Sequence, residues 1–185
     1  MDLNKAVKER HSVRKFKTKK PDYEKVLEAI EAANRAPLAG NIPTLKFLLI
    51  SDKEKIQQLA EAATQDFIAL ANYVVVICSD RTNCLRAYEE KGEIYSLQQA
   101  GAGIENFLLK ITDLKLATCW IGAFSEKMVK KALQIPPHIR VEGMFPVGYE
   151  MGETKQRTKS PVESIIYFDF WGNQYMKPMR RPEAG

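Results

Sequence analysis

The sequence predicts one layered domain of the α/β or α+β class, and two observations lead to this prediction. Short apolar runs, which are typical of buried strands, alternate along the chain with longer segments whose apolar residues recur at helical spacing. The 185 residues, of which 45% are hydrophobic, are enough to bury one substantial core. We therefore expect a single domain over residues 1–185.

Several segments have the apolar spacing of amphipathic helices. In one of them Val26, Ile30 and Ala33 recur on one face. Asp52 and Ser125 each precede such a segment and are suited to capping its first turn. The expected helices are residues 2–10, Tyr23–Arg35, 53–64, 95–113 and Glu126–Leu133.

The expected strands are short and rich in β-branched or aromatic residues. Within Arg140–Tyr149, Gly143 and Pro146 are expected to break the strand. Residues 79–94 are charged and irregular, and either a loop or a mobile helix is compatible with them. A polar loop over 151–161 and an extended tail after 170 complete the chain. The expected strands are 46–51, Tyr73–Cys78, Leu116–Trp120, Arg140–Tyr149 and Ile165–Phe170.

The chain is basic, with a formal net charge of +5 and a pI of about 9.0. This balance favours anionic partners such as phosphates, nucleotides or nucleic acid, and a solvated basic surface is the ordinary alternative. The basic residues are scattered, apart from Lys15–Lys20 and Lys177–Arg181. A nucleic-acid module more usually has a dense basic stripe with interleaved aromatics, so we do not expect this class of partner.

The sequence offers no pattern typical of a metal site, a secretory signal or a membrane span. Cys78, Cys84 and Cys119 do not have zinc-ligand spacing, and His11 and His138 lie far apart in the chain. No N-terminal apolar segment resembles a signal peptide, and no apolar run approaches the roughly 20 residues that span a bilayer. We expect no metal and a cytoplasmic location.

Familiar nucleotide and hydrolase motifs are absent or out of context. Gly101-Ala102-Gly103 begins like a dinucleotide fingerprint, but Asn106 replaces the third glycine and the segment falls inside an expected helix. Close helix packing is the better interpretation. Neither a Gly-Lys-Ser/Thr phosphate loop nor a Gly-x-Ser-x-Gly element is present.

A cluster of donors follows the first expected helix. Arg10 and Arg14 carry guanidinium groups, whose geometry matches phosphate oxygens bidentately, and Ser12 adds a hydroxyl. His11 lies between them. Taken alone, the segment also fits a solvated helix end.

With this cluster, a set of segments stands in the order of motifs found in the nitroreductase family of FMN enzymes. The chain resembles that family over about residues 3–170. The matching segments are Arg10–Arg14, Ala36–Asn41, Gln99–Ala123, Leu133–Pro136 and Pro146–Tyr149.

The resemblance implies an α+β fold of three layers, in which helices flank a central, mainly antiparallel sheet. It implies a homodimer with two FMN sites at the interface and a C-terminal segment that extends onto the partner subunit. Because the cofactor carries the redox chemistry, we name no catalytic acid or base.

The resemblance also implies roles for residues that match the family's motifs. Arg10, His11, Ser12 and Arg14 would hold the phosphate and the pyrimidine edge of the flavin. A loop from the other subunit would reach the same flavin, formed by Pro37, Leu38, Ala39, Gly40 and Asn41. Backbone contacts near the flavin N5 would come from Ile121, Gly122 and Ala123. Lys159 would help bind the phosphate, with Arg157 as the alternative.

The implied function is an NAD(P)H-dependent FMN oxidoreductase that reduces a nitroaromatic, a quinone or a similar acceptor by ping-pong hydride transfer. A flavin-binding electron-transfer protein is the alternative, as is a specialised branch that dehalogenates substrates or breaks down flavin. Specificity would reside in Asp80–Ser96, where Arg81, Arg86, Tyr88 and Tyr95 could stack on or pair with an aromatic or a nucleotide. An exposed charged helix is the other interpretation of that segment.

Three features depart from the family pattern. Ile42-Pro43-Thr44-Leu45 follows Asn41, where x-Gln-Pro-Trp is common. Lys159 stands in place of an arginine, so the bidentate guanidinium fork is lost. Lys115 stands where a glycine is common.

Overall fold

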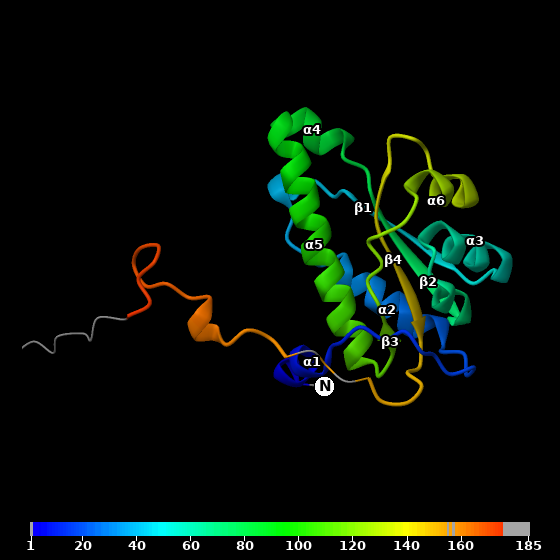
Figure 1. Cartoon of the computed structure of the whole chain (residues 1–185). Coiled ribbons are helices and arrows are strands. Elements are labelled where there is room, and N and C mark those ends of the chain that lie inside the picture. Colours follow the sequence, from blue (N-terminus) through cyan, green and yellow to red (C-terminus); the bar gives the residue numbers. More distant parts are fainter. Residues whose placement is uncertain (1, 155, 157, 176–185) are drawn as a thin grey trace, which may run out of the picture. The chain divides into compact units, whose positions relative to one another are not determined.

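The computed structural model describes residues 2–154, 156 and 158–175, which divide between two units, residues 1–154 and 155–185 (Figure 1). The single domain expected over the whole chain stays a prediction. The helices of the first unit are α1 (Leu3–Glu9), α2 (Tyr23–Ala33), η1 (Ala39–Asn41), α3 (Lys53–Ala63), η2 (Asp66–Leu70), α4 (Thr82–Tyr88), α5 (Glu90–Asp113) and α6 (Glu126–Leu133). Its strands are β1 (Leu45–Ile50), β2 (Tyr73–Ser79), β3 (Ala117–Thr118) and β4 (Arg140–Gly148).

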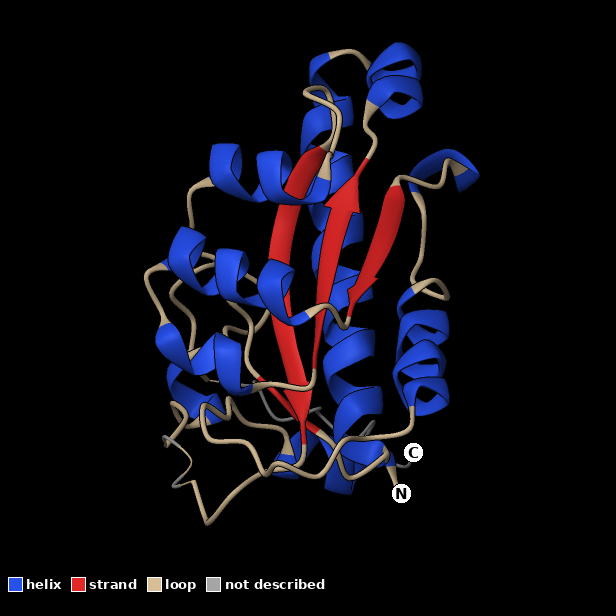
Figure 2. Cartoon of the chain, turned by 90° about the vertical axis from the view of Figure 1, so that its right-hand side faces the viewer, coloured by secondary structure: helices blue, strands red, loops and turns tan. Residues whose placement is uncertain are grey.

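The four strands form one sheet in the order β1-β2-β4-β3, and all three pairings are antiparallel. Strand β2 is buried along its whole length, as its unbroken apolar sequence predicts. Its side chains alternate between the two faces of the sheet. Figure 2 shows the strands among the surrounding helices.

Each face of the sheet has its own hydrophobic core. Val74, Val76 and Cys78 pack with residues of α3 and α6 on one face, and Val75 and Ile77 pack with α2 and α5 on the other. The molecule therefore has the three layers that the resemblance implied, with a helical layer on either side of the sheet.

Helix α5 is the longest element, with 24 residues. It packs closely on α2, because a Cβ at Gly103 would lie 3.1 Å from the Ala33 carbonyl oxygen and 2.5 Å from Leu45 Cδ1. A Cβ at Gly101 would meet nothing within 4 Å. Gly101 and Gly103 both lie within α5, as the sequence predicted. Gly103 allows the close packing of α5 on α2.

Two differences concern elements around the sheet. The charged segment 79–94 contains α4 and the first turn of α5, so α5 begins five residues earlier than predicted. Strand β4 is continuous through Pro146. The proline instead interrupts the hydrogen bonding between β4 and β3. Pro146 has no N–H, and it lies opposite a gap in the ladder between the Thr118–Val147 pair and the Ile121–Met144 bridge. Strand β3 is therefore only two residues long.

In the second unit, the strand expected over Ile165–Phe170 is wrong. The 3-10 helix η3 (Val162–Ser164) precedes a set of turns, in which the Phe168 amide donates to the Asn173 carbonyl at 2.7 Å. The aromatic residues serve a local turn, since the Tyr167 and Trp171 ring centroids lie 4.7 Å apart. Residues 176–185, the end of the expected tail, lie outside the described residues.

Candidate functional site

The N-terminal cluster, formed by Arg10, His11, Ser12 and Arg14, lies directly beside the end of the sheet. Helix α1 ends at Glu9, and the chain then runs extended past β3 and β4. The Val13 amide donates to the Thr118 carbonyl at 2.9 Å, and Phe16 forms a bridge with Glu150. These pairings bring the cluster next to β3 and to the residues after β4, which are more than a hundred residues away in sequence.

Two members of the cluster keep their polar groups available. Ser12 and Arg14 are exposed, and among the described residues no hydrogen bond or ion pair engages the Ser12 hydroxyl or the Arg14 guanidinium. Arg14 lies over the Phe67 ring, 5.9 Å from its centroid, which orients the guanidinium. Arg10 pairs through Nε with Glu105 at 3.5 Å. An anion can therefore be met by two guanidinium groups and a hydroxyl.

His11 is held differently, because both of its ring nitrogens have partners within the chain. Nδ1 lies 2.6 Å from the Glu9 carbonyl oxygen and Nε2 lies 3.1 Å from Glu150 Oε1. Burial acts to lower the pKa of His11, but the hydrogen bonds to Glu9 and Glu150 outweigh it, so the pKa is raised. Burial acts to raise the pKa of Glu150, and hydrogen bonds from Thr154 and His11 reverse this, so that pKa is lowered.

The glycine loop, formed by Ile121, Gly122 and Ala123, presents backbone donors. Ile121 is buried and exchanges two backbone hydrogen bonds with Met144, at 2.9 and 3.1 Å. Gly122 and Ala123 are exposed, and among the described residues their N–H groups have no backbone acceptor. A Cβ at Gly122 would meet nothing within 4 Å, so the chain's own packing does not require glycine there. The loop can donate to a ligand without a titrating side chain.

The proline loop, residues 37–41, lies elsewhere along α5. Gly40 and Asn41 both have a φ of 56°, a left-handed conformation that favours these residue types. A Cβ at Gly40 would lie 2.2 Å from Tyr88 Oη, which places the loop against α4. Just beyond it, the Thr44 hydroxyl donates to Gln99 of α5 at 3.4 Å.

The N-terminal cluster meets α5 farther along that helix. Arg10 pairs with Glu105, and His11 shares with Leu108 and Thr112 the lining of a cavity of about 40 Å³. The nine residues from Gln99 to Leu108 correspond to about 14 Å of helix. Within one chain, the N-terminal cluster and the proline loop therefore lie at different levels of α5.

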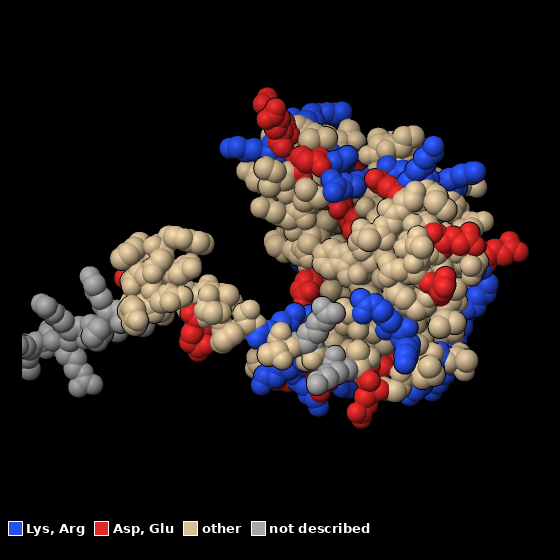
Figure 3. Space-filling model, viewed as in Figure 1, with Lys and Arg blue, Asp and Glu red and all other residues tan. Residues whose placement is uncertain are grey.

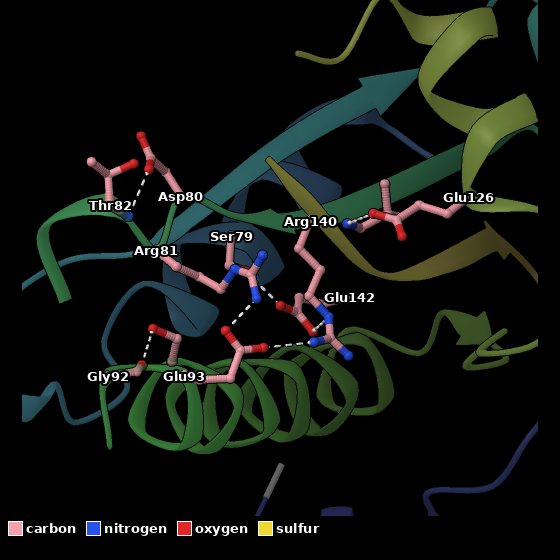
Figure 4. Close-up of polar contacts among 11 residues, drawn as sticks. Ser79, Asp80, Arg81, Thr82, Gly92, Glu93, Glu126, Arg140 and Glu142 are labelled. Atoms are coloured by element: carbon pink, nitrogen blue, oxygen red, sulfur yellow. Dashed lines mark hydrogen bonds and ion pairs between the residues drawn. The ribbon is translucent and has the colours of Figure 1, made fainter. Parts of the chain in front are cut away.

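A charged network, which sequence reasoning missed, joins Arg81, the residue before α4, to α5 and two strands (Figure 4). Arg81 pairs with Glu93, and Arg140 pairs with the same carboxylate at 3.0 Å. Glu142 accepts from the Ser79 hydroxyl at 2.5 Å and lies 3.5 Å from Arg140 Nε. Alternation of charges in sequence could not reveal this network, because its residues come from four separate elements.

This network borders a cavity of about 350 Å³ that reaches the glycine loop. Its lining residues are Arg81, Gly122, Phe124, Glu126, Lys130, Arg140 and Val141. The lining carries charges of both signs, since Lys130 pairs with Glu126 at 2.9 Å. In the segment expected to set specificity, Tyr88 and Tyr95 stack edge to face at 5.1 Å and Arg86 is exposed.

The two residues expected to complete the phosphate site lie in the second unit. Lys159 is exposed, and Arg157 lies outside the described residues. Their roles stay predictions. The described part of the chain contains no group of three or more His, Cys, Asp or Glu residues arranged for a metal ion. Among its helices, none has both the length and the apolar character required to cross a membrane.

One face of the molecule shows how its charges are distributed. On the face in Figure 3, lysines and arginines are interspersed with aspartates and glutamates, and no dense single-sign stripe crosses that face. A small anionic ligand at the N-terminal cluster fits this distribution better.

Comparisons with known proteins agree with the fold. The model of the nitroreductase family matches residues 7–72 and 61–149, which together span well over half of the chain. A Streptococcus pyogenes protein provisionally named an NAD(P)H nitroreductase is 27% identical over 198 residues, which cover 90% of this chain and 97% of the relative.

Solved structures match over nearly the whole length. An FMN-dependent nitroreductase of Clostridium difficile R20291 is 25% identical with a TM-score of 0.77, covering 90% of this chain and 98% of that one. A nitroreductase family protein of Clostridium novyi NT is 28% identical with a TM-score of 0.72, covering 94% and 96%. The mixed helical and antiparallel fold implied by the sequence is confirmed.

Proposed function

Because the chain belongs to the nitroreductase family, we propose that it is an FMN-dependent oxidoreductase that uses NAD(P)H to reduce a nitroaromatic, quinone or similar acceptor. The observation that carries this proposal is the presence of two donor sets, one attached to β3 and the other in the segment that follows β3. The N-terminal cluster, whose segment is bonded to β3 through Val13 and Thr118, offers cations and a hydroxyl. The glycine loop, which follows β3 along the chain, offers N–H groups for which the described residues provide no backbone acceptor. These donors complement the phosphate and the ring of a flavin mononucleotide.

The residues present fit FMN. Arg10, Ser12 and Arg14 would hold the phosphate and the pyrimidine edge, and Lys159 would add a further positive charge at the phosphate. A guanidinium at the pyrimidine edge favours the uptake of negative charge there. Gly122 and Ala123 would donate backbone N–H groups near N5, where a missing side chain at Gly122 allows close approach.

Bound FMN would supply the two-electron chemistry, accepting hydride from a nicotinamide and passing it to the acceptor. The chain's own contribution is position and field. The glycine loop carries no titrating group, so it orients the ring through main-chain donors at any ordinary pH. Backbone pairing of Ile121 with Met144 keeps this loop fixed to the sheet.

A homodimer would complete the site. The proline loop lies along α5 at a distance from the N-terminal cluster of the same chain, so a second copy would have to bring it to the flavin. Exposed apolar residues on α1 and α5 support such a partner surface: Leu3 and Val7 on α1, Ile94 and Leu97 on α5. In the second unit Phe170, Trp171 and Tyr175 are exposed, which suits a C-terminal segment that extends onto the partner subunit.

The test is an anaerobic absorbance spectrum of the purified protein, reconstituted with FMN, before and after addition of NADH or NADPH. We expect a flavin spectrum that bleaches on addition and recovers when a quinone or nitroaromatic is added. A flavin spectrum that persists with either nicotinamide would favour an electron-transfer role instead. Failure to retain FMN would overturn the proposal.

A further inference from the structure

His11 lies between two groups that can only accept hydrogen bonds. On one side is the Glu9 backbone carbonyl, 2.6 Å from Nδ1, and on the other is the Glu150 carboxylate, 3.1 Å from Nε2. A neutral imidazole has a single N–H and can satisfy only one of these acceptors. An imidazolium has two, so the geometry matches the protonated ring.

The charged groups around His11 are arranged to keep that proton. Glu150 faces the ring from the end of β4, and Arg10, its neighbour in sequence, is the cation that opposes protonation. Arg10 is itself paired with Glu105 of α5. The Glu9 carboxylate lies 3.6 Å from Lys5 of α1 and 3.4 Å from Lys115, which follows α5.

Among the described residues, the others that line the small cavity beside His11 carry no charge. Those from α5 and β3 are Leu108, Ile111, Thr112, Ala117 and Thr118. The raised pKa of His11 and the lowered pKa of Glu150 agree with the pairing seen in the geometry.

The position of this pair in the chain gives it a consequence for the site. His11 stands between Arg10 and Ser12, and Glu150 lies two residues after the end of β4, where it forms a bridge with Phe16. The two segments are also joined by backbone bonds, from Lys17 N to the Tyr149 carbonyl at 2.8 Å and from Met151 N to the Lys15 carbonyl at 3.0 Å. The His11–Glu150 pair is an additional link between the two segments, next to Arg10 and Ser12.

We propose that the His11 imidazolium and Glu150 form a clamp that fixes the N-terminal cluster for FMN, so that FMN affinity falls as His11 loses its proton. His11 is then a positioning residue, and its ring is not a ligand of the flavin. This inference rests on the proposed function, because it assigns the regulation of the same site by pH.

The sign of the linked stability follows from the directions of the two pKa shifts. The raised pKa of His11 means that its stabilising contribution is fully present below about pH 6.5, its unfolded pKa, and is lost as pH rises through the folded value. The lowered pKa of Glu150 means that its contribution is lost as pH falls through its folded value. The clamp is closed between these two limits.

The first experiment tests the clamp without flavin. His11 and His138 are the only histidines, so proton NMR of the two imidazoles, assigned with His138→Gln, follows the titration of His11 directly. We expect His11 to titrate above the ordinary histidine value and to shift downward in Glu150→Gln. A His11 titration that is unchanged in Glu150→Gln would overturn the clamp, whether or not FMN binds.

The second experiment measures the FMN dissociation constant from pH 5.5 to 8.5 in the full-length protein. The second phosphate proton of FMN titrates in this range as well, with a pKa of about 6. The comparison is therefore the ratio of affinities between Glu150→Gln and the unmodified protein at each pH. At pH 6 we expect Glu150→Gln to bind FMN about threefold to fivefold more weakly than the unmodified protein, which is the scale of a partly exposed ion pair. At pH 8.5 we expect the two proteins to bind FMN equally well.

A charge-retaining variant separates the clamp from simple packing. His11→Arg keeps a permanent cation with several donors, so we expect it to retain FMN affinity and to lose the affinity change that His11 causes between pH 6 and 8.5. If His11→Arg binds FMN as weakly as His11→Ala at every pH, the role of His11 is only steric and the proposal is wrong. If the unmodified protein does not bind FMN, the proposed function is wrong. The NMR titration still tests whether His11 and Glu150 form an ion pair.

Discussion

The N-terminal cluster and the proline loop were both expected to contact the same flavin, yet they are built into the molecule in different ways. The segment that carries the cluster is held to the end of the sheet by backbone hydrogen bonds from Val13 to Thr118 and from Lys17 to Tyr149. The proline loop is a short 3-10 turn with left-handed backbone at Gly40 and Asn41, packed against α4.

Under the proposed function, this difference means that the two regions would contact a flavin from different chains. The cluster and the glycine loop are attached to β3 and to the segment after it, whereas the proline loop lies at a different part of α5. A partner chain related by two-fold symmetry would bring the missing half to each site. The following predictions test this division.

The largest effect is expected from removing the cations of the cluster. Arg10→Ala combined with Arg14→Ala should weaken FMN binding by about 100-fold or more, since each charge-assisted hydrogen bond contributes about 1.5–3 kcal/mol. Flavin fluorescence titration measures the loss, and circular dichroism checks that the fold is kept. Lys127→Ala with Lys131→Ala on exposed positions of α6 is the matched control for net charge. Equal FMN affinity in the two double variants would remove the cluster from the site.

Mixing of variants tests whether the two halves come from different chains. One variant carries Arg10→Ala and Arg14→Ala, and the other carries Leu38→Asp and Asn41→Asp in the proline loop. If each flavin is bound between chains, random re-association of an equal mixture restores about a quarter of the sites, because every mixed dimer has one intact site. Absorbance of retained flavin gives the fraction. If both halves belonged to one chain, mixing would restore no sites.

The packing of α4, against which the proline loop lies, depends on Gly92. A Cβ there would lie 2.5 Å from the Cys84 carbonyl oxygen and 2.8 Å from Leu85 Cα, both of them backbone atoms that cannot move aside cheaply. Gly92→Ala should therefore lower the free energy of unfolding by about 2–4 kcal/mol. In the same helix, a Cβ at Gly101 would meet nothing within 4 Å. Gly101→Ala should therefore raise the free energy of unfolding by up to about 1 kcal/mol. Urea unfolding measures the free energy of unfolding of both variants. Equal changes in the two variants would contradict the close packing at Gly92.

The smallest effect is expected at the charged network beside α4. Glu93→Gln leaves Arg81 and Arg140 without their shared carboxylate. About a third of the Glu93 side chain is exposed, so solvent screening limits the expected loss of unfolding free energy to about 1 kcal/mol, and high salt should reduce it. Urea unfolding at two salt concentrations measures this. The control Glu90→Gln, at an exposed position of the same helix, should change the free energy of unfolding little. A loss in Glu93→Gln that does not depend on salt would contradict the ion-pair explanation.

Local patterns predicted most of the elements, because helices and buried strands are marked by spacing and composition. Helix α6 matches its prediction residue for residue, and Asp52 caps α3 by accepting from the Lys55 amide at 2.9 Å. The start of α5 was not predicted, because its first turn is charged and is fixed by packing against α4. The strand expected at Ile165–Phe170 failed, because apolar residues form a strand only where a neighbouring strand is available to pair.

The sequence by itself determined the order of the elements, the donors of the N-terminal cluster and the resemblance to a family. Only the tertiary structure decided which of these donors meet. The Val13–Thr118 bond and the His11–Glu150 pair join residues more than a hundred positions apart, and they exist because β3 and β4 pair in one particular register. Register and strand order arise from the packing of the whole sheet, so no local pattern in the chain reports them.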